Sequence, residues 1–354
     1  KSKPTQHSVN GLRRIGIQPD IILCRSDRPV HEEIKGKISL FCDVERKAVI
    51  PLPTTATIYE VPLTLEESGL GQLIVEKLTI EAREPELGQW HDLVNRLITP
   101  KDPVSIAMVG KYVELKDAYY SVREALCHAA LYHDREVNTT WVPSEDLERD
   151  GGDKLLASVQ GIVVPGGFGY RGIEGMVKAA TYAREHRIPF LGLCLGMQIM
   201  VIELARQALG PGANSSEFDP DTPYPVIDLL PQQRQVKEKG GTMRLGLYPC
   251  QLTPGTHAAQ AYGQSLVYER HRHRFEFNNR FRDILARAGL VYSGLSPDET
   301  LVEIAELADH PWMLSCQFHP EFTSRPDRPH PLFRDFIGIA KGVLVEGAQP
   351  SLPI

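Results

Sequence analysis

The spacing of apolar and polar positions becomes regular from Val104 onward, where short apolar runs alternate with longer stretches of helical spacing. The predicted strands are VSIAMVG (104–110), NTTWV (138–142) and GIVVPGG (161–167), and the predicted helices are DAYYSVREALCHAALYH (117–133) and GIEGMVKAATYAREH (172–186). Strands that alternate with helices predict an α/β fold, in which a mostly parallel sheet is covered by helices on both faces.

Further along, the segments SLVYERHRHRFEFN, LVYSGLS, LVEIAEL and WMLSCQFH predict added strands, and Asp335–Leu344 predicts a closing helix. The polar stretch 220–241 interrupts this pattern, so we interpret it as a mobile insertion. We expect residues 103–345 to form one domain, followed by a frayed tail at 346–354.

The first part of the chain is less regular. The pattern predicts helices at Ser8–Arg14 and Leu63–Ile80, and strands at Ile15–Cys24 and Ile38–Cys42. Residues 51–62 contain three prolines and predict loop and extended chain. We expect residues 1–82 to be the end of another domain and residues 83–102, with their mixed charge and prolines, to be a linker.

Composition and charge narrow the class of protein. The 354 residues are 42% hydrophobic and 24% charged, with a net charge of -6, which argues against a nucleic-acid or membrane-surface binder. No apolar run approaches the roughly 18 residues of a membrane span. The six cysteines are scattered without a C-x-x-C pair, so we expect a reducing, cytoplasmic setting with no disulfides and no metal site. The chain begins at Lys1 and not at a methionine, which suggests that the sequence starts inside a longer protein.

The stretch IPFLGLCLGMQIM (188–200) places one cysteine where a strand-like run becomes a helix-like run. Gly192 and Gly196 flank Cys194 in the G-x-C-x-G arrangement of a nucleophile elbow, a sharp turn that needs small neighbours. The turn would also set the sulfur at the positive end of a helix, which favours a thiolate. The alternative is an ordinary buried cysteine.

A nucleophilic cysteine needs a base, and the base needs an orienting group. The motif CQFHPEF supplies His319 and Glu321, two residues apart around a proline. A residue before proline favours extended geometry, and side chains at i and i+2 of extended chain share one side. We therefore expect the carboxylate to orient the imidazole. A surface His–Glu pair at a strand end is the alternative.

The glycine-rich run VVPGGFGYRG (163–172) would free backbone N–H groups to face a developing oxyanion. A phosphate cradle is the alternative for a glycine-rich loop before a helix, but the spacings of the known phosphate-binding motifs are absent.

The motifs PGGFG, GLCLGMQ and HPE, in this order, resemble a class I glutamine amidotransferase domain. The segments ERHRHRFEFN, GGTMRLG, ANSSEF and the opening KSKPTQHS narrow the resemblance to the CTP synthase family, over essentially the whole chain. The resemblance implies a flavodoxin-like amidotransferase domain, preceded by the end of a P-loop-type α/β synthetase (amidoligase) domain.

The resemblance also implies the site residues. Cys194 would be the nucleophile, His319 the base and then the acid, and Glu321 its orienter. The glutamine contacts would be Gly167, Leu195, Gly196, Met197, Gln198, Glu217 and Arg274. A free amino acid presents an ammonium and a carboxylate, which suits one acidic and one basic partner. Alternation in ERHRHRFEFN predicts arginines on one face and histidines on the other, but only the resemblance selects Arg274.

The resemblance further implies that glutamine hydrolysis feeds the amination of UTP to CTP. The UTP or CTP contacts would be Lys1, Ser2, Lys3, Pro4, Thr5, Gln6 and Lys37. The cofactors would be ATP and Mg²⁺, whose family sites lie upstream of Lys1, with GTP as activator near EKGGTMRLG and CTP as feedback inhibitor. A homo-oligomer, a tetramer in the family, is implied as well. The alternatives are another triad-type amidotransferase, such as a GMP synthase or carbamoyl-phosphate synthase small subunit, or a non-catalytic scaffold relative.

Overall fold

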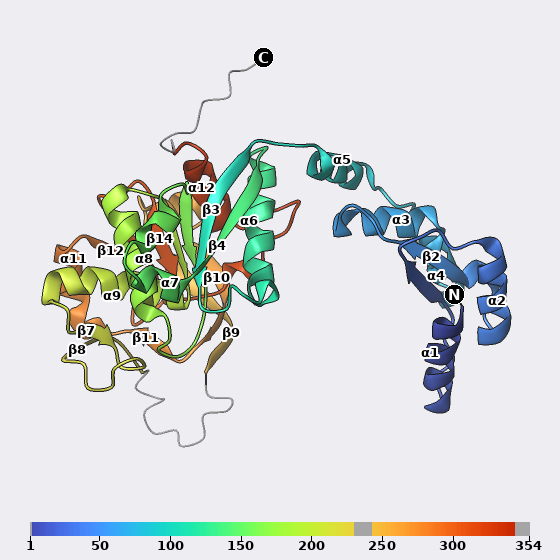
Figure 1. Ribbon diagram of the computed structural model, residues 1–354, viewed down its shortest axis with the longest axis horizontal. Helices are drawn as coiled ribbons and strands as arrows, with labels where there is room; N and C mark the ends of the chain where they lie inside the picture. The colour runs from blue at the N-terminus through green and yellow to red at the C-terminus, as the bar shows by residue number, and fades with distance from the viewer. Residues whose placement is uncertain (1, 230–242, 344–354) are drawn as a thin grey trace, which may run out of the picture. The chain divides into compact units, whose positions relative to one another are not determined.

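The computed structural model describes residues 2–229 and 243–343, and the chain divides between Pro100 and Lys101 into two compact units (Figure 1). Lys1, the predicted tail at 346–354 and the part of the predicted insertion from 230 to 241 lie outside the described residues. Part of EKGGTMRLG, where a GTP site was expected, therefore lies outside them too.

The first unit is a small α/β assembly around two parallel strands. In chain order it contains α1 (Lys3–Arg14), β1 (Ile22–Ser26), α2 (Glu32–Cys42), β2 (Val49–Pro53), α3 (Val61–Glu67), α4 (Leu70–Leu78) and α5 (Gly88–Ile98). Strands β1 and β2 pair in parallel, joined by α2 as a crossover helix. Their core consists of Val9, Ile22, Cys24, Ile38, Cys42 and Val49.

Several secondary-structure predictions for this unit were wrong. Residues 38–42 end helix α2 instead of forming a strand: Ile38 and Cys42, four apart, are buried, whereas Leu40 and Phe41 are exposed. The strand predicted over 15–24 is confined to β1, and the helix predicted over 63–80 is split into α3 and α4 at Gly69, which has a φ of 79°. The predicted linker contains helix α5, whose Trp90 donates a hydrogen bond to the Tyr59 carbonyl at 2.7 Å.

The second unit is built on a large mixed sheet. Among the described residues nine strands form it, in the order β10-β9-β12-β13-β14-β6-β5-β3-β4. The parallel part consists of β4 (Glu136–Pro143), β3 (Pro103–Gly110), β5 (Gly161–Val164), β6 (Phe190–Leu193) and β14 (Met313–Cys316). The antiparallel part consists of β13 (Val302–Leu307), β12 (Leu290–Leu295), β9 (Arg244–Leu252) and β10 (Leu266–His273).

Helices cover both faces of this sheet (Figure 1). One core contains residues of α8 (Ile173–His186), α9 (Leu195–Leu209) and α11 (Arg282–Arg287). The core on the other face contains residues of α6 (Tyr120–Tyr132), α10 (His257–Tyr262) and α12 (Pro331–Ala340). The short α7 (Ser144–Glu148) packs beside α8. The α/β prediction, with a parallel sheet covered on both faces and added strands after it, is confirmed.

A second, small sheet lies beside α9. Its strands β7 (Ala213–Ser215), β8 (Tyr224–Leu229) and β11 (Phe275–Phe277) pair in the order β11-β8-β7. Glu217 follows β7 and Arg274 immediately precedes β11. This sheet therefore brings together two residues that are far apart in the chain.

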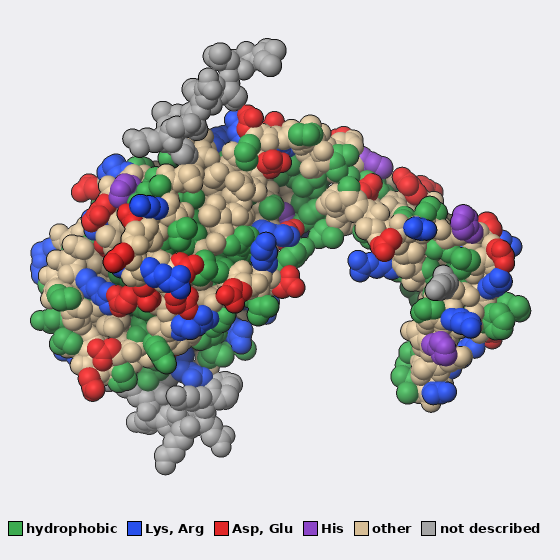
Figure 2. Space-filling model, viewed as in Figure 1, with side chains coloured by type: hydrophobic (Ala, Val, Ile, Leu, Met, Phe, Trp, Pro, Cys, Tyr) green, Lys and Arg blue, Asp and Glu red, His purple; other side chains and the backbone are tan. Residues whose placement is uncertain are grey.

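Acidic and basic side chains are intermixed on the visible face of the second unit (Figure 2). In the part of the chain that the structure describes, no helix combines the length and the apolar character that a membrane span requires.

Candidate active site

Cys194 lies in the tight connection from β6 to α9. Its backbone has φ 52° and ψ −97°, a strained conformation for a residue with a side chain. A Cβ on Gly192 would lie 2.6 Å from the backbone of Gly196, and a Cβ on Gly196 would collide with the Val164 carbonyl oxygen. The structure thus has the geometry of a nucleophile elbow, with the sulfur at the N-terminus of a 15-residue helix.

Gly196→Ala is expected to destabilise the second unit, because backbone atoms of β5 occupy the space of the added methyl group. Overpacking of this kind costs about 1–3 kcal/mol, or about 2–4 °C in Tm per kcal/mol for a unit of this size. Thermal unfolding followed by circular dichroism measures it. Gly342→Ala is the matched control, since its Cβ would make only an ordinary contact, 3.4 Å from the Ile339 carbonyl. Equal Tm values for the two variants would contradict this account.

His319 and Glu321 follow β14, the sheet neighbour of β6. The imidazole Nδ1 lies 2.8 Å from Glu321 Oε1, and both side chains are largely buried. Burial disfavours the imidazolium, but the hydrogen bonds to Cys194 and Glu321 outweigh it and raise the pKa of His319 to about 10. The site therefore favours the imidazolium form of His319 at neutral pH.

The backbone conformation that brings His319 and Glu321 together differs from the predicted extended chain. Glu321 lies in a 3-10 turn, Pro320–Phe322, and not in extended chain. The turn is held to the sheet because the His319 N–H donates to the Arg270 carbonyl at 2.8 Å. Likewise, the Cys194 N–H donates to the Cys316 carbonyl at 2.7 Å, which ties the elbow to β14.

The glycine-rich loop lies directly against the elbow. A Cβ on Gly166 would lie 3.0 Å from the His319 ring, and one on Gly167 would lie 3.1 Å from the Leu195 side chain. The Gly167 backbone thus lies against the Leu195 side chain, and the Gly166 backbone lies against His319 and Cys194. Backbone N–H groups of a loop in this position, beside the sulfur-bearing residue, are suited to stabilise an oxyanion.

Lys111 is a site residue that sequence reasoning missed. It is buried, and its ammonium donates hydrogen bonds to the carbonyls of Phe168, at 3.1 Å, and of Gly169. Burial lowers the pKa of Lys111 to about 8, although Glu217 opposes the shift. Glu217 in turn accepts the Gly169 N–H at 3.1 Å. Lys111 and Glu217 therefore both hold the glycine-rich loop by hydrogen bonds to its backbone. The available signal was a lysine directly after strand β3, at the carboxyl edge where ligands bind in parallel sheets.

Two cavities meet at Cys194. One, of about 290 Å³, is lined by Gly167, Phe168, Cys194, Gln198, Glu217, Met243, Arg272, His273, Arg274 and Phe275. It contains Gly167, Gln198, Glu217 and Arg274, four of the predicted glutamine contacts. Gly196 packs against β5, and the side chains of Leu195 and Met197 are buried in the core.

The other cavity, of about 450 Å³, shares Gly167, Phe168, Cys194 and Arg272 with the first. Its lining includes Tyr119, Phe168, Cys194, Leu245, Arg270, Arg272, His319 and Phe322. The guanidinium of Arg272 lies 5.8 Å from the ring centre of Phe168, and that of Arg270 lies 5.7 Å from the ring centre of Phe322. The predicted alternation is present in β10, where Arg270 and Arg272 are exposed and His271 and His273 are buried.

The predicted nucleotide contacts lie in the first unit. Ser2 precedes α1, whose first residues are Lys3 to Gln6, and Lys37 lies in α2, where it pairs with Glu33 at 2.5 Å. These nucleotide contacts stay predictions.

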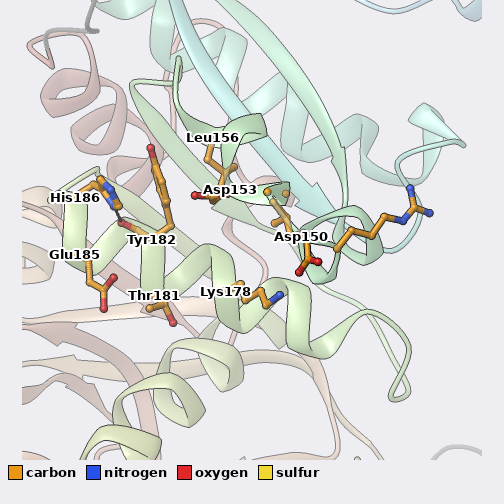
Figure 3. A pocket seen from close by; sticks show the side chains of 12 residues that line it. Asp150, Asp153, Leu156, Lys178, Thr181, Tyr182, Glu185 and His186 are labelled. Atoms are coloured by element: carbon orange, nitrogen blue, oxygen red, sulfur yellow. Dashed lines mark hydrogen bonds between the residues drawn. The ribbon is translucent and has the colours of Figure 1, made fainter.

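A further pocket, of about 350 Å³, lies where α8 meets the segment after α7 (Figure 3). Its lining includes Asp150, Lys178, Thr181, Tyr182, Glu185 and His186, with the Tyr182 and His186 rings stacked at 3.9 Å. None of the triad residues is among its lining residues, so the chemistry belongs to the elbow.

Comparison with known proteins identifies both parts of the chain. Residues 114–339 match the family described as glutamine amidotransferase class-I, and residues 1–80 match the CTP synthase N-terminus. The chain is 64% identical over 355 aligned residues to a CTP synthase from Dehalococcoides mccartyi, and 59% identical to one from Chloroflexus aurantiacus. Each alignment covers 100% of this chain but 65% of the relative, so the chain spans about two thirds of these relatives' length.

Among solved structures, the glutaminase domain of Trypanosoma brucei CTPS with bound acivicin is 37% identical, with a TM-score of 0.64. The match covers 67% of this chain and 94% of that domain. Together with the elbow, the His–Glu pair and the glycine-rich loop, these matches show that the chain belongs to the class-I glutamine amidotransferases of the CTP synthase family.

Proposed function

We propose that the second unit hydrolyses glutamine and that the ammonia serves the amination of UTP to CTP. The observation that carries the proposal is the Cys194–His319–Glu321 constellation at the edge of a cavity containing one acidic and one basic side chain, Glu217 and Arg274. A strained, buried cysteine beside an imidazolium and a glycine-rich loop is the arrangement that acyl transfer through a thioester requires.

In this proposal the free amino acid is held at both ends. Arg274 pairs with its carboxylate and Glu217 with its ammonium, since charge-assisted hydrogen bonds are the strong ones. Gly167 and the first turn of α9, Leu195, Gly196, Met197 and Gln198, surround the side-chain amide. Glu217 already accepts a hydrogen bond from the oxyanion loop, so substrate binding and loop position depend on the same carboxylate.

The chemistry proceeds through a thioester. The Cys194 thiolate attacks the amide carbon, and the N–H groups of Gly167 and Leu195 receive the charge that develops on the carbonyl oxygen. His319 gives its proton to the departing nitrogen, so that the C–N bond breaks and ammonia leaves. The now neutral His319 takes a proton from water, whose oxygen attacks the thioester and expels the thiolate with glutamate. Glu321 holds the imidazole in the required tautomer throughout.

The proposal for the nucleotide half of the reaction is based on the family to which the chain belongs. ATP with Mg²⁺ would phosphorylate UTP so that ammonia has a group to displace, and GTP would activate the glutaminase. UTP, or CTP as feedback inhibitor, would contact Lys1 to Gln6 and Lys37, because flexible lysines suit triphosphates. We further propose a cytoplasmic homotetramer. The organisation proposed is 1–82 as synthetase end, 83–102 as connection and 103–345 as glutaminase.

The test separates the two halves. We expect these 354 residues to release glutamate and ammonia, but to form no CTP from ATP, UTP and glutamine, even with added ammonia, because phosphoryl transfer needs a phosphate-cradling loop and metal-holding carboxylates. The same residues preceded by the remaining third of a curated relative should form CTP from either nitrogen source. Glutamate release is measured by coupled assay and CTP by nucleotide chromatography.

Either half of the proposal can fail on its own. CTP formed by the 354 residues alone would contradict the division between the units. A complete lack of glutamate release, from both proteins, would leave only a non-catalytic scaffold.

A further inference from the structure

Gln317 lies between β14 and the catalytic histidine, and its side chain is fully buried. Its backbone N–H donates to the Glu303 carbonyl at 2.8 Å, which fixes it to β13. Its side-chain Nε2 lies 3.6 Å from the sulfur of Cys194, within the range of an N–H···S hydrogen bond. The amide thus touches the reacting atom from the side of the sheet core.

The orientation of this amide is informative. A buried amide normally uses both its donors and its acceptor, yet Gln317 Oε1 has no hydrogen-bond partner among the described residues. The reversed amide would set a carbonyl oxygen against the sulfur, where it would accept a hydrogen bond from a neutral thiol but repel a thiolate. The observed arrangement leaves the acceptor unsatisfied and directs the donor at the sulfur, which suits an anionic sulfur.

Other groups face Cys194 as well. His319 is its proton partner, and the Arg272 carbonyl oxygen lies 4.0 Å from the sulfur. The titratable and charged side chains that line the two cavities at the sulfur are Tyr112, Asp117, Tyr119, Glu217, Arg270, Arg272, His273, Arg274, His319 and Glu321, and the buried thiol of Cys316 interacts electrostatically with Cys194. Gln317 differs from all of these side chains because its amide does not titrate. Its N–H donor therefore remains available to the sulfur at every pH.

We propose that Gln317 is a further catalytic residue, whose side-chain amide donates a hydrogen bond to the thiolate of Cys194. A hydrogen bond to the charged form of a group favours that form, so the bond increases the thiolate fraction before glutamine is attacked. It also favours departure of the thiolate when water cleaves the thioester, because the sulfur regains its charge in that step. The inference rests on the proposed glutaminase function.

The test is the pH dependence of alkylation. Iodoacetamide reacts with thiolates, and peptide mapping by mass spectrometry follows Cys194 separately from the other five cysteines. In Gln317→Met, which keeps the length of the side chain but has no N–H, we expect the midpoint for Cys194 to rise by about one pH unit, about tenfold in thiolate fraction below the midpoint. Gln317→Asn, whose amide is too short to reach the sulfur, should shift it in the same direction and serves if the methionine variant fails to fold.

Ser315→Ala is the matched control, because Ser315 is buried two residues earlier, in β14, and its hydroxyl contacts Met200 and the Ala305 carbonyl instead of Cys194. Its midpoint should equal that of the wild type. Unchanged midpoints in folded Gln317→Met and Gln317→Asn would overturn the role of the amide while leaving the glutaminase intact. An equal shift of the midpoint in Ser315→Ala would also overturn it, because the shift would then arise from a change in core packing and not from loss of the hydrogen bond. An ordinary thiol midpoint for Cys194 in the wild type would overturn this inference and the proposed function together.

Discussion

Replacing Cys194 by alanine is expected to reduce glutamine hydrolysis by about a million-fold, to the level that binding and the oxyanion loop alone sustain. The reason is that the thioester route requires the sulfur, and the members of a catalytic triad act as one unit. Glutamate release under saturating glutamine measures the effect. Binding of glutamine, followed by calorimetry, should be retained, since Glu217 and Arg274 are untouched.

Cys127→Ser is the control for this experiment. Cys127 is a half-buried thiol on α6, and burial raises its pKa to about 11, so it is an unreactive cysteine at neutral pH. Its replacement should leave hydrolysis within twofold of the wild type. More than one per cent residual activity in Cys194→Ala would show that another nucleophile performs the reaction.

Glu321→Gln is expected to reduce kcat by up to about 10⁴-fold, less than loss of the sulfur, because Glu321 orients the base and moves no proton itself. The carboxylate is one of the two partners that raise the pKa of His319. Without it the pKa falls, so the alkaline limb of the pH–rate profile, where the imidazolium is lost, should move to lower pH. Activity measured from pH 6 to 10 shows both effects.

Glu269 provides the matched control. It accepts a hydrogen bond from His330 at 2.9 Å, both side chains are buried, and the pair lies outside the cavities at Cys194. Glu269→Gln should therefore alter stability and leave the pH–rate profile in place. If Glu321→Gln kept wild-type activity, or lowered it without moving the profile, Glu321 would not be the orienting residue.

The features that could be predicted from the sequence are those encoded locally. The elbow needs glycines within two residues of Cys194, and the alternation in β10 involves successive residues. Both features can therefore be predicted from neighbouring positions in the sequence. The strand prediction at 38–42 was wrong because five apolar-rich residues fit the spacing of a strand and that of a helix equally well. The segment is helical because this conformation buries Ile38 and Cys42 on one face.

The remaining features depend on contacts between distant segments. The sequence gives no indication that β14 pairs with β6, yet this pairing brings Cys194 and His319 together. The roles of Lys111 and Gln317 follow from the same sheet order, since each contacts the site from its own strand end. A single sequence does not show which distant segments become neighbours. The triad was predicted from the local motifs around Cys194 and His319, whereas the glutamine contacts, including Arg274, came only from the family resemblance.

The pairing of β6 with β14 has a consequence for the growing polypeptide. Gln317 follows Cys194 by 123 positions, and the base and its orienter come later still. Domains fold as units during synthesis from the N-terminus, and contacts of large sequence separation form late. A nascent chain can therefore assemble β3, β5 and β6 while the thiol still lacks its proton partner. Under the proposed function, we therefore expect glutamine hydrolysis to begin only when nearly the whole amidotransferase unit has left the ribosome, and unfinished chains to consume no glutamine.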